Sequence, residues 1–238
     1  MYAKDAEGIV HQFTNTNDGT WHWSGSTGDK SVPLNKNTIP SDVKKQLDLP
    51  KKGGGVMIFG DPNKFAILID YVSIWSSEGG YKNGLFHLII NGEFFPDYAS
   101  VATLSGDISC LSDDNALITV PEDEYLFKAE KLDSFSKIMS KMLPNLLNPD
   151  AEISDDFEAD YRYQASTYNL ENDTCYVFSV GYMREVRMFS AKVSYLYGND
   201  YEGYEWKNNN NLEVHEVILS KDEVHRIVSE VKAKYELI

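Results

Sequence analysis

The sequence has little of what disulfide-rich, metal-binding or membrane-spanning proteins need. Its 238 residues include only two cysteines, Cys110 and Cys175, and neither has another Cys or a His at ligand spacing. We therefore expect two buried thiols rather than a disulfide framework or a zinc site. No stretch approaches the roughly 20 apolar residues of a membrane-spanning helix. Residues 1–18 also lack the apolar run of a signal peptide, which predicts a cytoplasmic protein.

Positive charge is scarce as well. The chain has 22 Lys and Arg against 37 Asp and Glu, a formal net charge of −15 at pH 7. Nucleic-acid-binding proteins contact phosphates with clustered Lys and Arg, so direct binding to nucleic acid is not expected. Residues 1–56 carry 7 lysines and 6 acidic residues, so the remainder of the chain carries −16. An acidic surface of this kind favours a basic protein partner.

The common catalytic motifs are missing too. The sequence has no Gly-rich phosphate loop, no Gly-x-Ser-x-Gly turn and no His-Glu-x-x-His helix. Its acidic clusters lack the alternating ligands and turn glycine of a calcium loop. His87 and His215 lie within strand-like runs, where histidines are more often hydrogen-bonded or solvent-facing than metal ligands. We therefore expect neither an enzyme nor a metal or other cofactor.

One group of N-terminal residues could nevertheless support catalysis: His11, His22, Ser24, Thr27 and Lys30. A histidine acting as general acid and base, with hydroxyls and a lysine around a phosphate, could cleave RNA without a metal ion. Small polar residues in a turn explain residues 24–28 without any chemistry, and we favour that interpretation. RNA cleavage centred on His22 remains the alternative.

The chain separates into two segments of different character. Residues 1–55 are polar and end in Lys-Lys-Gly-Gly-Gly, a composition typical of a linker. Within them, the residues around an Asn-Asp-Gly turn at 17–19 predict a hairpin, and residues 39–47 predict a short helix. We place the domain boundary here, with an appendage at residues 1–55 and a folded domain at residues 57–238.

The second segment mixes strand and helix patterns without regular βαβ alternation, which predicts an α+β fold. We expect a mainly antiparallel sheet of about five strands with two to four packed helices, besides the small N-terminal hairpin-and-helix appendage. The predicted strands are residues 64–73, 84–91, 93–95, 174–180, 186–197 and 212–219. The predicted helices are residues 98–111, residues 132–147 with a disturbance at Pro144, and a last helix that begins with a capping box at Ser220.

Acidic clusters beside aromatic residues are the candidates for binding a partner, because carboxylates steer a basic protein while aromatic side chains anchor it. The aromatic candidate is Trp75, and the acidic candidates are Asp113, Asp114, Glu122, Asp123, Glu124, Asp155, Asp156 and Glu158. Solvated loops would explain the same carboxylates. Sequence alone does not show which of these side chains are neighbours.

The second segment also resembles a known family. The residues that carry the resemblance are 57–67 (MIFGDPNKFAI), Asp70, Trp75, 83–86 (NGLF), 90–93 (INGE), Pro96 and 216–223 (EVILSKDE). They resemble immunity protein family 42 of bacterial polymorphic toxin systems, and the similarity extends from Met57 to about Ile238. The resemblance implies a non-enzymatic protein, encoded beside its toxin, that binds the cognate toxin domain and blocks it in the cytosol of the producing cell.

Residues 1–55 depart from that family and look instead like the C-terminal tail of a polymorphic toxin, notably at residues 22–30 and 39–40. This resemblance implies a toxin remnant joined in frame to its own immunity protein. Two other interpretations stay open. The chain could be a small nuclease fused to its inhibitor, or a structural or regulatory protein without a toxin partner.

Overall fold

The chain divides into two compact units, Met1–Gly53 and Gly54–Ile238. The computed structural model describes residues 2–5, 9–15, 21–35, 39–40, 43–44, 47, 56–77 and 79–237. The predicted turn at residues 17–19, most of the predicted helix at residues 39–47 and the predicted linker at residues 51–55 lie outside the described residues.

The N-terminal unit contains a three-stranded antiparallel sheet in the order β1-β2-β3. Its strands are β1 (Tyr2–Lys4), β2 (Val10–Asn15) and β3 (Trp21–Ser26). The pairing of β2 with β3 confirms the predicted hairpin, and its register shifts between Gln12 and Phe13. The additional strand β1 pairs with β2, a contact that the local sequence pattern did not predict.

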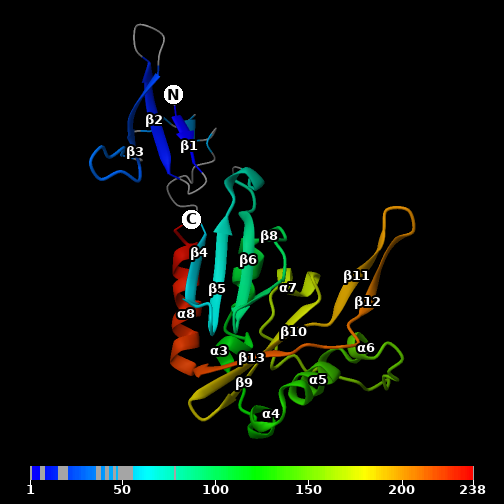
Figure 1. The fold of residues 1–238 in the computed structure, drawn as a ribbon. Coiled ribbons are helices and arrows are strands. Elements are labelled where there is room, and N and C mark those ends of the chain that lie inside the picture. Colours follow the sequence, from blue (N-terminus) through cyan, green and yellow to red (C-terminus); the bar gives the residue numbers. More distant parts are fainter. Residues whose placement is uncertain are drawn as a thin grey trace. The chain divides into compact units, whose positions relative to one another are not determined.

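The second unit begins with a five-stranded antiparallel sheet (Figure 1). Its strands are β4 (Met57–Asp61), β5 (Phe65–Tyr71), β6 (Asn83–Ile90), β7 (Glu93–Phe95) and the short β8 (Ala102–Thr103), which pairs with β6. A 3-10 turn, η2 (Ser73–Trp75), lies between β5 and β6. The predicted antiparallel pairing of the β5 and β6 runs is confirmed.

A second sheet has the order β13-β10-β9, from β9 (Cys175–Tyr182), β10 (Glu185–Lys192) and β13 (His215–Ser220). Between β10 and β13 the chain forms a separate hairpin, β11 (Ser194–Asn199) with β12 (Gly203–Asn208). The predicted single strand at residues 186–197 is therefore two strands in different sheets. The α+β fold class is confirmed, but the strands of the second unit are distributed over three sheets rather than one of about five.

The described helices are α2 (Leu104–Cys110), α3 (Ala116–Thr119), α4 (Glu124–Lys128), α5 (Lys131–Met142), α6 (Pro144–Leu147), α7 (Tyr168–Asn172) and α8 (Lys221–Tyr235). Among the described residues, none of these helices is long and apolar enough to cross a membrane. The predicted helix at residues 98–111 begins only at Leu104, because Ala102 and Thr103 pair with β6 instead. The predicted disturbance at Pro144 is confirmed, since α5 ends before it and α6 begins with it.

Two large apolar cores lie in the second unit, besides a small cluster of Ala66, Leu68 and Ile89. The first joins one face of the five-stranded sheet to α2 and α8, and Figure 1 shows α8 lying along β4 and β5; its members include Phe65, Ile67, Ile69, Phe86, Leu88, Leu104, Val224, Ile227 and Val231. The second packs α4 and α5 against the β13-β10-β9 sheet, with Phe127, Phe135, Ile138, Met142, Phe178, Val180 and Phe189. Cys175 is buried in the first core as predicted, whereas Cys110 is only half-buried.

Candidate functional site

The three acidic clusters differ in how far their charges are available. Asp113 and Asp114 lie in the turn between α2 and α3, and both side chains are exposed. Asp155, Asp156 and Glu158 lie in the long segment between α6 and α7 and are also exposed. A hydrogen bond from the Ser154 side chain lowers the pKa of Asp156, because the bond stabilises the ionised carboxylate. These five carboxylates present negative charge to the solvent.

The cluster at residues 122–124 is held by contacts within the protein. Its contacts are Glu122 with Lys221 Nζ at 2.7 Å, Asp123 with Leu126 N at 2.9 Å and Tyr163 Oη at 3.1 Å, and Glu124 with Lys128 Nζ at 2.5 Å and Tyr182 Oη at 3.1 Å. Asp123 thereby caps the N-terminus of α4. This cluster fastens α4 to neighbouring elements, a role that the sequence pattern did not indicate.

Trp75 ends the 3-10 turn η2, and 42% of its surface is exposed. Its backbone carbonyl accepts a hydrogen bond of 2.7 Å from Asn83 Nδ2, which holds the β5–β6 connection. In Figure 1 this connection and α4 lie at opposite ends of the second unit. The structure therefore does not bring Trp75 together with the cluster at residues 122–124.

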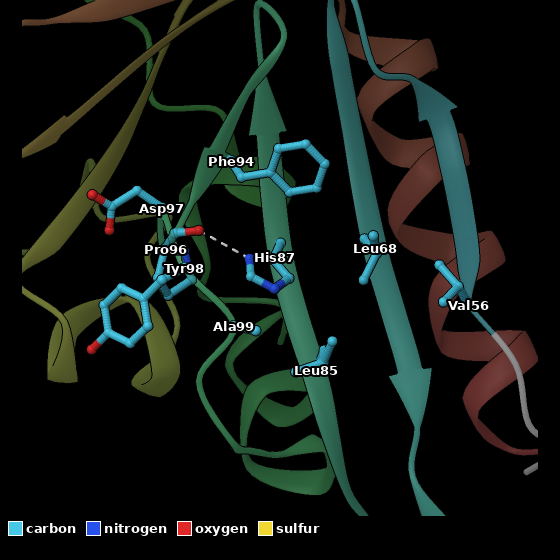
Figure 2. A pocket seen from close by; sticks show the side chains of 9 residues that line it. All are labelled: Val56, Leu68, Leu85, His87, Phe94, Pro96, Asp97, Tyr98 and Ala99. Carbon is cyan, nitrogen blue, oxygen red and sulfur yellow. Dashed lines mark hydrogen bonds between the residues drawn. The ribbon is translucent and has the colours of Figure 1, made fainter. Parts of the chain in front are cut away.

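A shallow pocket opens on the face of the five-stranded sheet that α8 does not cover (Figure 2). Its volume is about 260 Å³, and it is lined by Val56, Leu68, Leu85, His87, Phe94, Pro96, Asp97, Tyr98 and Ala99. The lining side chains of β5 and β6 alternate with core residues such as Ile67 and Phe86, which point to α8. The pocket is mostly apolar, which suits an apolar side chain of a partner better than a charged substrate.

His87 is the polar group at the centre of this pocket. Its Nδ1 lies 3.0 Å from the carbonyl oxygen of Pro96, and because a carbonyl only accepts, Nδ1 donates (Figure 2). Burial lowers the pKa of His87, so the ring is neutral near pH 7. The hydrogen bond that Tyr98 donates to Asp173 raises the pKa of the Tyr98 phenol to about 12. Both groups are held neutral, and their contacts orient the loop at residues 96–99.

The family comparison covers most of the second unit, since residues 57–234 match the family described as immunity protein 42. The chain belongs to the immunity protein 42 family. The family resemblance of the residues from Met57 onward is thereby confirmed. The matched range contains all three acidic clusters, Trp75 and every residue that lines the pocket at His87 except Val56.

The fold of this immunity protein 42 domain is also similar to a solved structure. The crystal structure of CdiI from Burkholderia dolosa AUO158 is similar to this chain with a TM-score of 0.57 and 26% sequence identity. The similarity covers 75% of this chain and 99% of that chain. No curated protein matches the sequence.

The immunity protein 42 match does not include residues 1–56, where His11 and His22 were the catalytic candidates. His11 Nε2 lies 3.0 Å from Asp5 Oδ2, and Trp23 Nε1 donates to His11 Nδ1 at 3.2 Å. Phe13 and Trp23 are paired across β2 and β3, so their side chains lie on the same face of the sheet. Side chains alternate along a strand, so His11 lies on the same face as Phe13, and His22 lies on the face opposite to Trp23. The two candidate histidines therefore do not share a site.

The other members of that group hold the backbone of the N-terminal unit. Ser24 Oγ donates to the Gln12 carbonyl oxygen at 3.1 Å, and Thr27 Oγ1 accepts from Val10 N at 3.0 Å. Lys30 is exposed in the bend that follows β3. Both hydroxyls therefore bond backbone groups, but Ser24 lies within β3 rather than in the predicted turn, whereas Thr27 lies in the bend that follows β3. In the described residues no group of His, Cys, Asp or Glu is placed to hold a metal ion.

Sequence reasoning missed two features of this immunity protein 42 domain. One is the pocket at His87. The hydrogen bond from His87 to the Pro96 carbonyl joins β6 to the residue after β7, and no local sequence pattern links these two residues. The other is the hairpin of β11 and β12, which carries several exposed aromatic side chains. A signal for the hairpin was present, because Tyr195, Leu196 and Tyr197 are consecutive and a strand directs consecutive side chains to both of its faces.

Proposed function

We propose that the chain is an immunity protein that binds the cognate toxin domain of a bacterial polymorphic toxin system, contact-dependent or secreted, and neutralises it. One observation carries the proposal: the match to immunity protein 42 extends over residues 57–234, nearly the whole second unit. The similarity to a CdiI protein over 99% of that protein's length supports it.

The proposed mode of action is occlusion of the toxin by a folded acidic surface, without bond-making. Residues 57–238 contain 31 acidic and 15 basic residues, and the carboxylates at residues 113–114 and 155–158 are exposed. Such a surface accelerates encounter with a basic domain and disfavours acidic competitors. We therefore propose a basic toxin domain as the partner and the cytosol of the producing cell as the site of action.

Co-production tests this proposal. The toxin domain encoded by the neighbouring upstream gene would be expressed in a host cell alone, with this chain, or with an immunity protein from an unrelated family. We expect growth only with this chain, and a nanomolar Kd for the purified pair, which corresponds to about −12 kcal/mol. Undiminished toxicity in the presence of this chain would refute the proposal.

The absence of catalysis is part of the proposal and needs its own assay. The purified full chain would be incubated with RNA and with DNA, and we expect no cleavage. The variants His22→Ala and His215→Ala serve as a matched pair, because His22 lies in the N-terminal unit and His215 lies in the second unit. Cleavage that only His22→Ala abolishes would establish the nuclease alternative instead.

A further inference from the structure

The hairpin of β11 and β12 extends from the body of the second unit (Figure 1). Its two strands pair with each other and with no other strand among the described residues. The base is fixed, because the Ser194 carbonyl oxygen accepts from Thr174 Oγ1 at 2.7 Å and Asn208 Nδ2 donates to the Leu146 carbonyl oxygen at 3.1 Å. The hairpin is therefore an arm with a firm base.

The tip of this arm is also ordered by its own contacts. Asn199 Oδ1 accepts from the backbone nitrogens of Tyr201 and Glu202, both at 3.0 Å. Gly203, with φ of 83°, takes a conformation that residues with a side chain rarely adopt. Contacts of this kind preorganise a binding surface, which reduces the entropy lost when a partner docks.

The arm carries a concentration of exposed apolar side chains that the fold does not use. The exposed fractions are 44% for Tyr195, 52% for Leu196, 54% for Tyr197, 100% for Tyr201, 57% for Tyr204 and 53% for Trp206. A two-stranded hairpin by itself is at best marginally stable, because it has no apolar core. A core within the arm therefore does not explain these side chains. Grouped exposed aromatic residues mark interaction surfaces, and Trp and Tyr are the residue types most enriched at binding hot spots.

The two faces of the arm differ. The register places Tyr195 opposite Lys207 and Tyr197 opposite Glu205 on one face. On this closed face Lys207 Nζ lies 3.6 Å from the centre of the Tyr197 ring and 3.0 Å from Glu205 Oε1. The charges and one aromatic ring of the closed face are therefore already partnered within the hairpin.

The other face, which we call the open face, consists of Leu196, Tyr204 and Trp206. Leu196 and Trp206 are directly opposite each other across the strands. Tyr204 lies two residues before Trp206 on β12, on the same face. Gly198 stands opposite Tyr204, where an added Cβ would come within 2.1 Å of the Gly203 carbonyl oxygen. The open face is thus a continuous apolar strip beside a position that tolerates no side chain.

The charge around this strip indicates its partner. Residues 194–208 contain three acidic side chains and one basic, and the basic one, Lys207, belongs to the closed face. Tyr204 Oη donates to Asp200 Oδ1 at 3.1 Å, which keeps a carboxylate at the rim of the open face. An arginine or lysine can stack on the Trp and Tyr rings while its charge meets such carboxylates.

We propose that the open face of this arm is the docking site for the basic toxin domain, with Trp206 and Tyr204 as its anchors. The proposal rests on the proposed function, because the toxin supplies the partner. It adds the location of the contact and the chemistry that recognises it. The partner surface offers apolar contact area flanked by Arg or Lys side chains.

The test compares matched double variants of the full chain. The toxin domain from the neighbouring upstream gene would be separated from the co-purified chain in denaturant and refolded, and its Kd measured by biolayer interferometry. Tyr204→Ala/Trp206→Ala removes the open face, and Tyr195→Ala/Tyr197→Ala removes two aromatic side chains from the closed face. We expect the Kd to rise about 100-fold or more in the first variant and less than about threefold in the second.

A second variant guards against local unfolding of the arm. Asp200→Lys/Glu202→Lys keeps the aromatic strip and reverses two tip charges, and we expect about tenfold slower association with little change in dissociation. Thermal unfolding midpoints equal to that of the wild type would show that the body of each variant is intact.

The outcomes separate the two proposals. Tight binding by the wild type together with wild-type affinity in the open-face variant would overturn the docking site and leave the proposed function standing. A wild-type chain that neither binds nor protects would overturn both. Light scattering that shows a dimer of this chain, dissociated by the open-face variant, would assign the face to a second copy and overturn the proposal.

Discussion

Arg187 shows at the scale of one residue how a buried charge joins separate elements. It lies near the start of β10, and only 7% of its surface is exposed. Its guanidinium contacts Glu216 at 2.5 Å and donates to the carbonyl oxygens of Phe127 and Ala129, both at 2.7 Å. The side chain therefore ties β10 to β13 and to the end of α4, and a buried arginine is tolerated because its donors find acceptors.

Arg187→Ala is expected to lower the free energy of unfolding by about 3 kcal/mol, because it leaves a carboxylate and two carbonyl oxygens without a donor. Urea denaturation followed by circular dichroism measures the loss. The control is Arg226→Ala, which removes an exposed i,i+4 ion pair with Glu230. The control should change stability by less than about 0.5 kcal/mol, and equal losses in the two variants would contradict the role assigned to Arg187.

His87 predicts a pH dependence of stability. Burial lowers the pKa of His87 in the folded protein, so the unfolded chain binds the proton more readily. The contribution of neutral His87 to the free energy of unfolding is therefore fully present above the ordinary pKa of about 6.5. This contribution is lost as the pH falls from there toward the pKa of His87 in the folded protein. Denaturation at several pH values between about 7.5 and 5 should show the wild type losing stability relative to His87→Gln. Parallel curves for the two proteins would disprove this linkage.

At the scale of elements, the sequence predicted where a helix begins more accurately than it predicted which strands pair. The capping box at Ser220 was predicted, and Ser220 Oγ accepts from Glu223 N at 3.2 Å at the start of α8. Residues 186–197 were predicted as one strand, yet the chain leaves the sheet at Val193 and enters the β11–β12 hairpin. A cap is a contact between near neighbours in sequence, whereas strand pairing joins distant residues.

Loss of the Ser220 cap should destabilise the fold moderately. Ser220→Ala removes the acceptor for one backbone N–H in the first turn of α8, and such changes cost about 1 kcal/mol. Thermal and urea unfolding measure this loss. Ser229→Ala changes an exposed serine inside the same helix and serves as the control. Because alanine favours helix, the control should be neutral or slightly stabilising, and a larger loss there would argue against capping as the cause.

At the scale of the whole molecule, charge is distributed unevenly between the segments. Residues 1–56 carry +1 and the remainder −16. If the toxin is basic, raising ionic strength from about 0.05 M to about 0.5 M should slow association by about tenfold or more, since screening shortens the reach of the field. Stopped-flow mixing measures the association and dissociation rates separately. An association rate that does not depend on salt would contradict electrostatic steering.

The two cores predict that residues 57–238 suffice for the proposed function. Every residue of both clusters lies between Met57 and Tyr235. We expect a chain of residues 57–238 to unfold at the same temperature as the full chain and to protect cells equally well against the toxin domain. A lower midpoint or lost protection would assign residues 1–56 a part in folding or binding.

The sequence by itself determined the fold class, the family, the acidic character of the second segment, and the helix start at Ser220. The fold class, the acidity and the helix start follow from composition, periodicity and contacts between near neighbours, whereas the family follows from the resemblance of particular residues, such as 57–67 and 216–223, to known members. Only the tertiary structure decided that the carboxylates at residues 122–124 bind internal partners, that His11 and His22 lie on opposite faces, and that Trp206 lies on an open face. Each of these depends on strand register or on packing between distant segments, which a local pattern does not specify.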